Sequence, residues 1–158
     1  MKKMPIWTLV LIIGVICLAV GLLPWYSRIN IALPGVEIPA GGTAEDGITL
    51  YVEGWYRNYI FRQDTVQASI RIQASNGDEH IRLKIDAPTY DKGGAEIWTS
   101  TPYYDEKSDR YDVVMVAFDE AMDVFVISFP SKESVYVAAS GIDEKLPDIL
   151  KKFDFIIG

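Results

Sequence analysis

The longest apolar stretch of the chain comes at its start. Residues 4–26 contain no charged side chain. At about 1.5 Å of rise per residue, a helix of that length crosses a hydrocarbon core of about 30 Å. Trp7 lies near one end of the stretch and Trp25 near the other, as aromatic side chains do at the two interfaces of a membrane. We therefore expect a transmembrane helix, and assign residues 1–26 to a cytoplasmic N-terminus and membrane anchor.

The charges that flank this stretch predict its orientation. Lys2 and Lys3 precede it and only Arg28 follows closely, which favours a cytoplasmic N-terminus and an extracytoplasmic C-terminal domain. A cleaved secretory signal begins in a similar way, and Ala19 with Gly21 could serve as its cleavage site. The apolar residues continue past these positions to an aromatic pair, so a retained, single-pass signal-anchor is the favoured interpretation.

The next segment has a different composition. Residues 27–47 contain two prolines and four glycines with little alternation, so we expect a linker with at most a short edge strand near its middle. From Ile48 to Glu53 apolar and polar residues alternate, which is typical of a half-buried strand. Gly54 then suggests a bulge or bend. We expect an extracytoplasmic β-rich domain over residues 48–158.

The pair Asn76-Gly77 predicts a tight β-hairpin. Asn-Gly supplies the two positive φ angles of a type I′ turn, so residues 67–75 and 78–86 should pair antiparallel. With these two residues as the loop, one face of the hairpin is entirely apolar, and a slip by one residue would destroy this agreement. The apolar pairs are Ile72 with Ile81, Ile70 with Leu83, and Ala68 with Ile85.

The other face of this hairpin carries a cationic stripe. The same register places Arg71 opposite Arg82, Ser69 opposite Lys84, and Gln73 opposite His80. Like charges across a ladder are unfavourable, so either a neighbouring strand supplies counter-ions or the stripe binds an anion, whose phosphate or carboxylate group suits the planar fork of arginine. The candidate counter-ions are Glu53, Glu96 and Asp112. The candidate anion-binding face is Arg71, Arg82, Lys84 and His80.

The rest of the chain is also predicted to be mainly β, with one closing helix. Strands are expected at residues 95–99, 112–118, 124–129 and 135–139, the second and third forming a hairpin. A helical spacing of apolar residues from Leu146 to Phe153 predicts a short helix, in which Pro147 is tolerated only in the first turn. Phe155-Ile156-Ile157 should pack back on the sheet. The expected fold class is an N-terminal transmembrane helix followed by one antiparallel β-sheet domain, a sandwich or a meander, with a short C-terminal helix.

Charge and composition exclude several kinds of function. The formal net charge is −7, and the outer domain is more acidic still because two lysines precede the anchor, so nucleic acid is not an expected partner. The one cysteine, Cys17, lies in the apolar stretch, and the chain has one histidine. Neither a cysteine nucleophile paired with histidine nor a zinc cluster can be built from them. We expect no catalytic residue, no metal and no cofactor.

Two further groups of side chains have alternative interpretations. Acidic residues gather at 105–112 and at 119–123, where they would form solvated loops or hold calcium through carboxylate oxygens. Tyr103, Tyr104 and Tyr111 flank the first of these loops. They would either pack on the sheet or form an aromatic surface for a carbohydrate or peptide.

One run of the sequence carries a resemblance. Residues 54–66 read Gly-Trp-Tyr-Arg-Asn-Tyr-Ile-Phe-Arg-Gln-Asp-Thr-Val and are followed by the Ile70-Arg71-Ile72 strand. This layout resembles small single-pass membrane proteins of uncharacterised function in Gram-positive bacteria, which also have an N-terminal anchor, a β-rich outer region and a C-terminal helix. The resemblance implies a bacterial cell membrane as the location. It implies no site residue.

The leading functional prediction is a membrane-anchored extracytoplasmic binding or accessory module without catalytic activity. Its partners would be the membrane, through residues 4–26, and an anionic envelope ligand or a protein. One alternative is a structural subunit of a cell-envelope or pilus-like assembly. A second alternative is a carboxylate-based hydrolase, which would require two acids to converge in one cleft.

Overall fold

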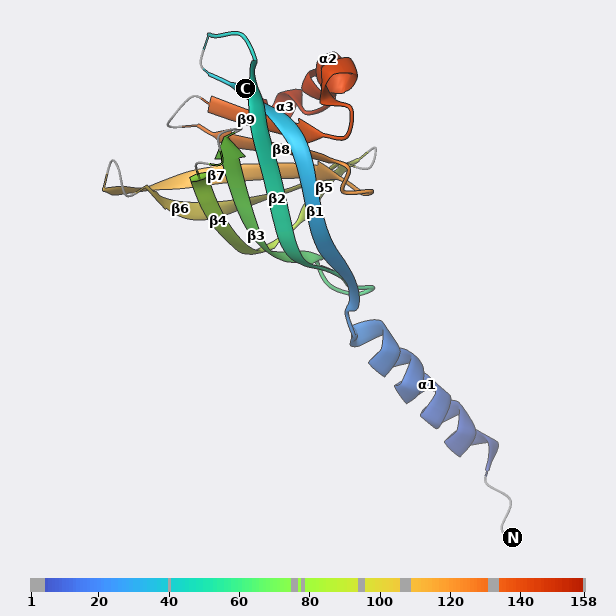
Figure 1. Ribbon diagram of the computed structural model, residues 1–158. Coiled ribbons are helices and arrows are strands. Elements are labelled where there is room, and N and C mark those ends of the chain that lie inside the picture. Colours follow the sequence, from blue (N-terminus) through green and yellow to red (C-terminus); the bar gives the residue numbers. More distant parts are fainter. Residues whose placement is uncertain are drawn as a thin grey trace.

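A computed structural model of the chain describes residues 5–39, 41–74, 77, 79–93, 96–105, 109–130 and 134–157. A single helix, α1 (Ile6–Leu22), projects from a β domain that carries two short helices near its other end (Figure 1). The strands are β1 (Trp25–Ile38), β2 (Glu45–Asn58), β3 (Thr65–Ala74), β4 (Glu79–Pro88), β5 (Tyr90–Gly93), β6 (Glu96–Asp105), β7 (Arg110–Asp119), β8 (Val124–Phe129) and β9 (Ser134–Ala139).

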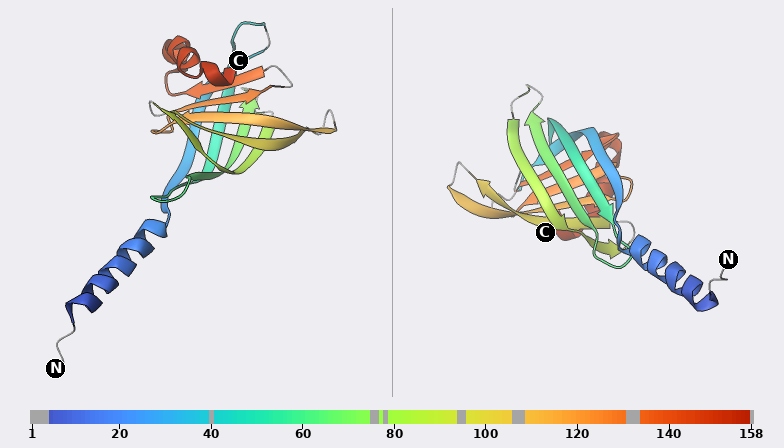
Figure 2. Two further views of the ribbon diagram at one scale, coloured as in Figure 1. Left: turned by 180° about the vertical axis from the view of Figure 1, so that it is seen from behind. Right: turned by 90° about the horizontal axis from the view of Figure 1, so that it is seen from below.

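The nine strands found in the described residues form one antiparallel sheet. Their order is β4-β3-β2-β1-β9-β8-β7-β6-β5, so the chain runs up and down and β1 meets β9. The two ends of the sheet approach each other, with β4 beside β6, and the Thr99 hydroxyl donates to the Pro88 carbonyl at 2.9 Å. The result is a nearly closed, barrel-like sheet (Figure 2). The predicted mainly β, antiparallel class is confirmed; the sheet is a closed-up meander, not a sandwich.

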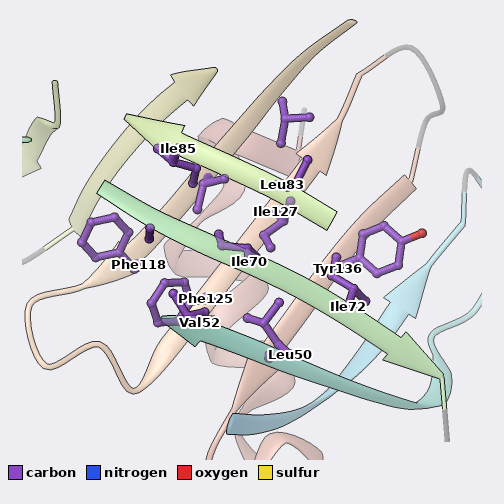
Figure 3. Close-up of a cluster of buried hydrophobic side chains, with 14 of the residues drawn as sticks. Leu50, Val52, Ile70, Ile72, Leu83, Ile85, Phe118, Phe125, Ile127 and Tyr136 are labelled. Atoms are coloured by element: carbon purple, nitrogen blue, oxygen red, sulfur yellow. The ribbon is translucent and has the colours of Figure 1, made fainter. Parts of the chain in front are cut away.

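Apolar side chains fill the inside of this sheet. The alternation along each strand sends one face inward, where large residues such as Phe118, Ile127 and Ile70 are fully buried (Figure 3). Burial of this apolar surface is the main source of stability for the domain. The interior of the sheet is therefore a packed core along most of its length.

The β3–β4 hairpin has the predicted register at all three apolar pairs, including Ile70 with Leu83. The register shifts after Ile72, however, so Gln73 faces Glu79 rather than His80. Gly77 has the positive φ of 87° that a tight turn requires. Asn76 lies outside the described residues.

The segment predicted as a linker, residues 27–47, mostly belongs to a long strand. β1 has 14 residues and pairs with β2 along nearly all of its length. Prolines and glycines misled the prediction, because each has a different role here. Gly35 allows β1 to approach β9 closely, since a Cβ at this position would lie 2.5 Å from the Val137 carbonyl oxygen. A single glycine thus permits the pairing that brings the two halves of the sheet together.

Gly54 also differs from its expected role. The β1–β2 and β2–β3 registers both continue without a shift through this residue, so it does not form a bulge. A Cβ on Gly54 would overlap the backbone of Gln67 and Ala68 on the neighbouring strand. The glycine is needed for close approach of backbones rather than for a turn.

The second predicted hairpin is confirmed. β7 and β8 pair across the turn at 119–123, with Phe118 facing Phe125. β6 is longer than expected, because it continues from Glu96 to Asp105 and pairs with β7 to its end. Much of the charged loop expected at 105–110 lies outside the described residues.

Two short helices cover the outside of the sheet at β7, β8, β9 and β1. They are α2 (Ile142–Lys152) and α3 (Asp154–Ile157). Ile149, Phe153 and Ile156 are buried in a second apolar cluster with outward-facing strand residues, which confirms that the chain end packs back on the sheet. Pro147 is the sixth residue of α2, not in its first turn, so only one bond near the helix start lacks its donor.

The N-terminal helix is shorter than the uncharged stretch. α1 has 17 residues and ends at Leu22; Pro24 separates it from β1, which begins at Trp25. The expectation that the helix includes residues 23–26 is therefore wrong. Measured against the length and apolarity needed to cross a membrane, no helix in the described part of the chain qualifies.

Candidate functional site

A cavity of about 800 Å³ lies at the end of the barrel-like sheet nearest α1. Four parts of the chain form its walls: the start of β1, the end of β2 with the β2–β3 loop, the region from Thr89 to Ile97, and the β7–β8 turn. Its polar and charged lining residues are Ser27, Arg28, Tyr56, Asn58, Tyr59, Arg62, Gln63, Asp64, Thr89, Tyr90, Asp91 and Glu120. The cavity volume lies in the range of known small-molecule sites.

Asp64 holds one wall of this cavity together. Its carboxylate accepts hydrogen bonds from the Tyr56 hydroxyl (3.0 Å) and the Tyr59 backbone N–H (2.7 Å). The backbone carbonyl oxygen of Asp64 accepts a hydrogen bond from the Thr89 backbone N–H at 2.8 Å. The Gln63 side-chain amide adds a bond to the Thr89 carbonyl at 3.1 Å. The β2–β3 loop is thereby fixed to the β4–β5 junction across the open end of the sheet.

The Tyr56 hydroxyl stays protonated at physiological pH. Burial raises the pKa of Tyr56 to about 12, and the negative charge of Asp64 adds to this effect. The Thr89 hydroxyl lies 3.5 Å from the same oxygen. Tyr56 is therefore a hydrogen-bond donor to Asp64 rather than a base, and this pair is a structural element of the cavity wall.

Two arginines are the side chains in the cavity best placed for a ligand. Arg28 comes from β1 and Arg62 from the β2–β3 loop, and both are exposed. Among the described residues, neither guanidinium has a hydrogen-bond or ion-pair partner. Arginine binds phosphate and carboxylate through two parallel hydrogen bonds. Asp91 and Glu120 give the cavity negative groups as well.

The predicted cationic stripe lies on the outer face of the sheet. A small hollow of about 190 Å³ is lined by Tyr51, Glu53, Ser69, Arg71 and Arg82. The Arg71 guanidinium carbon is 4.6 Å from the centre of the Tyr51 ring, a cation–π contact. Glu53 faces Ser69 on the next strand, so a neighbouring strand does bring a negative charge to the stripe.

The other members of the predicted anion-binding face are placed differently. Lys84 pairs with Ser69 in the register and is exposed, but it does not line the hollow. His80 no longer faces Gln73, and its side chain lies outside the described residues. The structure thus brings together Arg71 and Arg82 but does not place all four predicted residues in one site.

The second acidic loop serves the turn between β7 and β8. The Asp119 carboxylate accepts from the backbone N–H groups of Asp123 (2.8 Å) and Val124 (3.1 Å). Within the described residues, no three or more His, Cys, Asp or Glu side chains gather as metal ligands would. Residues 106–108 of the first acidic loop lie outside that description.

The three tyrosines near that first loop separate into two groups. Tyr103 packs inward against Phe129, with ring centres 5.5 Å apart. Tyr104 and Tyr111 face each other on the outside of the β6–β7 hairpin, with ring centres 5.1 Å apart. The three tyrosines therefore do not form one continuous aromatic surface.

Sequence reasoning did not identify the cavity, although it singled out part of it. Tyr56, Tyr59, Arg62 and Asp64 all belong to the run of residues 54–66 that carried the resemblance. The concentration of aromatic, basic and acidic residues in a loop was the available signal. The remaining walls come from distant parts of the chain, so only the closed sheet brings them together.

A scan against protein-family models, a search of curated proteins and a search of solved structures each found no match.

Proposed function

We propose that this protein is a membrane-attached, extracytoplasmic binding module without catalytic activity, and that the cavity at the α1 end is its binding site. The observation that carries the proposal is a cavity of about 800 Å³ lined by Arg28 and Arg62, whose guanidinium groups have no hydrogen-bond or ion-pair partner within the described part of the chain. The ligand class that this arrangement favours is a molecule with a phosphate or carboxylate group.

The surface of α1 supports attachment to a membrane. Its side chains are apolar on all sides, and Trp7 is 84 % exposed. Such a helix gains stability only when another apolar medium covers it, and the β domain covers only Gly21. The 17 residues of α1 rise about 25 Å, so the flanking uncharged residues of the 4–26 segment must complete the apolar layer. Lys2 and Lys3 favour an N-terminus on the cytoplasmic side.

The cavity is a better anion site than the cationic stripe. Arg71 already lies against the Tyr51 ring, and Glu53 shares the hollow with it. An anion there would compete with this carboxylate, and the hollow of about 190 Å³ is much smaller than the cavity. The cavity is also lined by the carboxylates of Asp64, Asp91 and Glu120, and that of Asp64 already accepts hydrogen bonds from Tyr56 and Tyr59.

A thermal-unfolding experiment with inorganic phosphate compares the two sites directly. The full chain in non-ionic detergent micelles is titrated with phosphate, and with chloride at equal ionic strength as the reference. A ligand that binds only the folded state raises stability, by about 2.7 kcal/mol at 100 times its Kd. We expect the phosphate-specific rise to disappear in Arg28→Gln/Arg62→Gln and to persist in the matched Arg71→Gln/Arg82→Gln variant. A wild-type protein that responds equally to phosphate and chloride contradicts the proposed site.

One observation favours the alternative of a structural subunit. β9 pairs with β1 only from Gly35 to Ile38, so within the described residues Trp25–Pro34 have a strand partner on the β2 side alone. The free edge could accept a strand from another copy, as in β-augmentation. Light scattering of the detergent-solubilised chain tests this alternative: a concentration-independent monomer contradicts it.

A further inference from the structure

The large apolar side chains that remain exposed on the described β domain, and on the short segment joining it to α1, fall into two groups. One lies at the α1 end: Leu23, Trp25, Tyr26, Trp55, Ile60, Phe61 and Tyr90. The other lies along the β6–β7 hairpin: Tyr104, Tyr111 and Val113. We name Trp25, Tyr26, Trp55, Ile60 and Phe61 the aromatic rim. The rim residues come from the start of β1, the end of β2 and the β2–β3 loop, which lie at the end of the sheet nearest α1 (Figures 1 and 2).

The rim is built on well-paired strands, yet it is not covered by the rest of the protein. Tyr26 of β1 and Trp55 of β2 make an edge-to-face contact with ring centres 6.2 Å apart. The Arg57 guanidinium lies 5.9 Å from the Tyr26 ring centre. Trp25 is still 63 % exposed and Trp55 45 % exposed. The rings of Tyr26 and Trp55 are thus held against each other, and all three rings keep much of their surface exposed.

The β2–β3 loop connects the rim to α1. Gly21 is the one buried residue of α1, and a Cβ at this position would overlap the Phe61 ring. Phe61 nevertheless remains 67 % exposed. The apolar surface of α1 therefore continues without a break onto the loop that also forms a wall of the cavity.

We propose that the aromatic rim docks into the interfacial layer of the same bilayer that α1 enters, so that the β domain rests on the membrane instead of being loosely tethered to it. This inference depends on the proposed membrane attachment. Aromatic rings prefer the level of the lipid headgroups, where one side meets hydrocarbon and the other meets water. Arg62 is exposed next to Phe61 at the same end, and its guanidinium can pair with lipid phosphates.

Docking in this way places the mouth of the cavity at the membrane surface. Arg28 and Arg62 line the cavity, and Arg62 is the residue that follows Phe61, a member of the rim, in the sequence. A ligand would then reach the two arginines from the headgroup layer. The β6–β7 hairpin points away from this layer, and Tyr104 there is engaged by the Asp109 carboxylate.

Fluorescence quenching by brominated lipids tests the docking. Three versions of the full chain are reconstituted in phosphatidylcholine bilayers with bromines near the headgroup end of the acyl chains. One version keeps only Trp7 in α1 and one keeps only Trp55 in the rim, with the other tryptophans changed to Phe. In the third, all four native tryptophans are changed to Phe and Tyr111→Trp places one on the hairpin, at a position that is 77 % exposed against 45 % for Trp55. Circular dichroism and thermal unfolding confirm that each variant is folded.

We expect bromine to reduce the fluorescence of the Trp7 and Trp55 proteins and to leave that of the Tyr111→Trp protein unchanged. Quenching of Trp7 without quenching of Trp55 overturns the docking while leaving membrane attachment intact. No quenching of Trp7 refutes the attachment itself. A Trp55 spectrum that is shifted to shorter wavelength but insensitive to bromine shows that protein, such as a second copy, covers the rim, and it also overturns the proposal.

Discussion

Replacing Asp64 with alanine should weaken the fold and open the cavity wall at once. The Asp64 carboxylate accepts the Tyr56 hydroxyl at 3.0 Å and the Tyr59 N–H at 2.7 Å, in a partly buried position. Hydrogen bonds to a charged group contribute about 1.5–3 kcal/mol each. Taking the lower value for each bond, because water reaches part of the site, Asp64→Ala should lower the free energy of unfolding by about 3 kcal/mol.

Thermal unfolding followed by circular dichroism measures this effect. For a domain of this size each kcal/mol corresponds to roughly 3 °C, so Asp64→Ala should lower the Tm by about 9 °C. Asp64→Asn keeps an acceptor of similar size without the charge and should lose about half as much. Asp123→Ala is the control, because Asp123 is exposed and bonds to Asp119 through its backbone N–H, which the substitution keeps. It should change the Tm by less than about 2 °C.

The same variant has a functional readout. Asp64 fixes the loop that carries Arg62, so Asp64→Ala should also reduce the phosphate-dependent stabilisation, measured at a temperature where the variant is still folded. If Asp64→Ala unfolds at the same temperature as Asp123→Ala, the carboxylate does not hold the loop and the described cavity wall is incorrect.

Three further substitutions test other parts of the structure. The folded-state pKa of Tyr56 is raised from about 10 to about 12, so its contribution to stability is complete below pH 10 and is lost as the pH rises to 12. Tyr56→Phe should therefore reduce the fall in the free energy of unfolding between about pH 10 and about pH 12. Gly54→Ala should cost about 3 kcal/mol in chemical denaturation because its Cβ overlaps β3, whereas Gly14→Ala, with open space around it, should be neutral. Phe153→Ala should cost about 3–5 kcal/mol and release α2 to proteolysis, with exposed Lys151→Ala as the control.

Local patterns in the sequence predicted the hairpins but not their assembly. The register of Ile70 with Leu83 could be derived because turn chemistry and alternation both act over a few residues. The pairing of Gly35 with Ala138 joins positions about a hundred residues apart, and nothing near Gly35 in the sequence indicates its partner. Closure of the sheet was therefore not predictable, although the antiparallel class was.

Glycine and proline caused the main errors for a physical reason. Both residues usually mark turns, so residues 27–47 looked like a linker and Gly54 looked like a bend. In the structure Gly35 and Gly54 allow two backbones to approach, and Pro34 stands in β1 beyond the last residue paired with β9. The site was missed for a related reason. The pairing of β1 with β2 brings Arg28 and the loop of Arg62 to one end of the sheet, but the walls from Thr89 to Asp91 and from Glu120 to Met122 join them only when the sheet closes.

The central proposal is that the β domain is attached to a membrane and lies outside the cytoplasm. Cysteine labelling of the chain in intact bacterial cells tests this location most directly. The Cys17→Ser change removes the sole cysteine, and Ser140→Cys adds one at an exposed position between β9 and α2. A membrane-impermeant maleimide should label this variant in intact cells, and the labelled protein should stay in the membrane pellet after an alkaline wash. Labelling that appears only after lysis, or recovery in the soluble fraction, would contradict the proposed location.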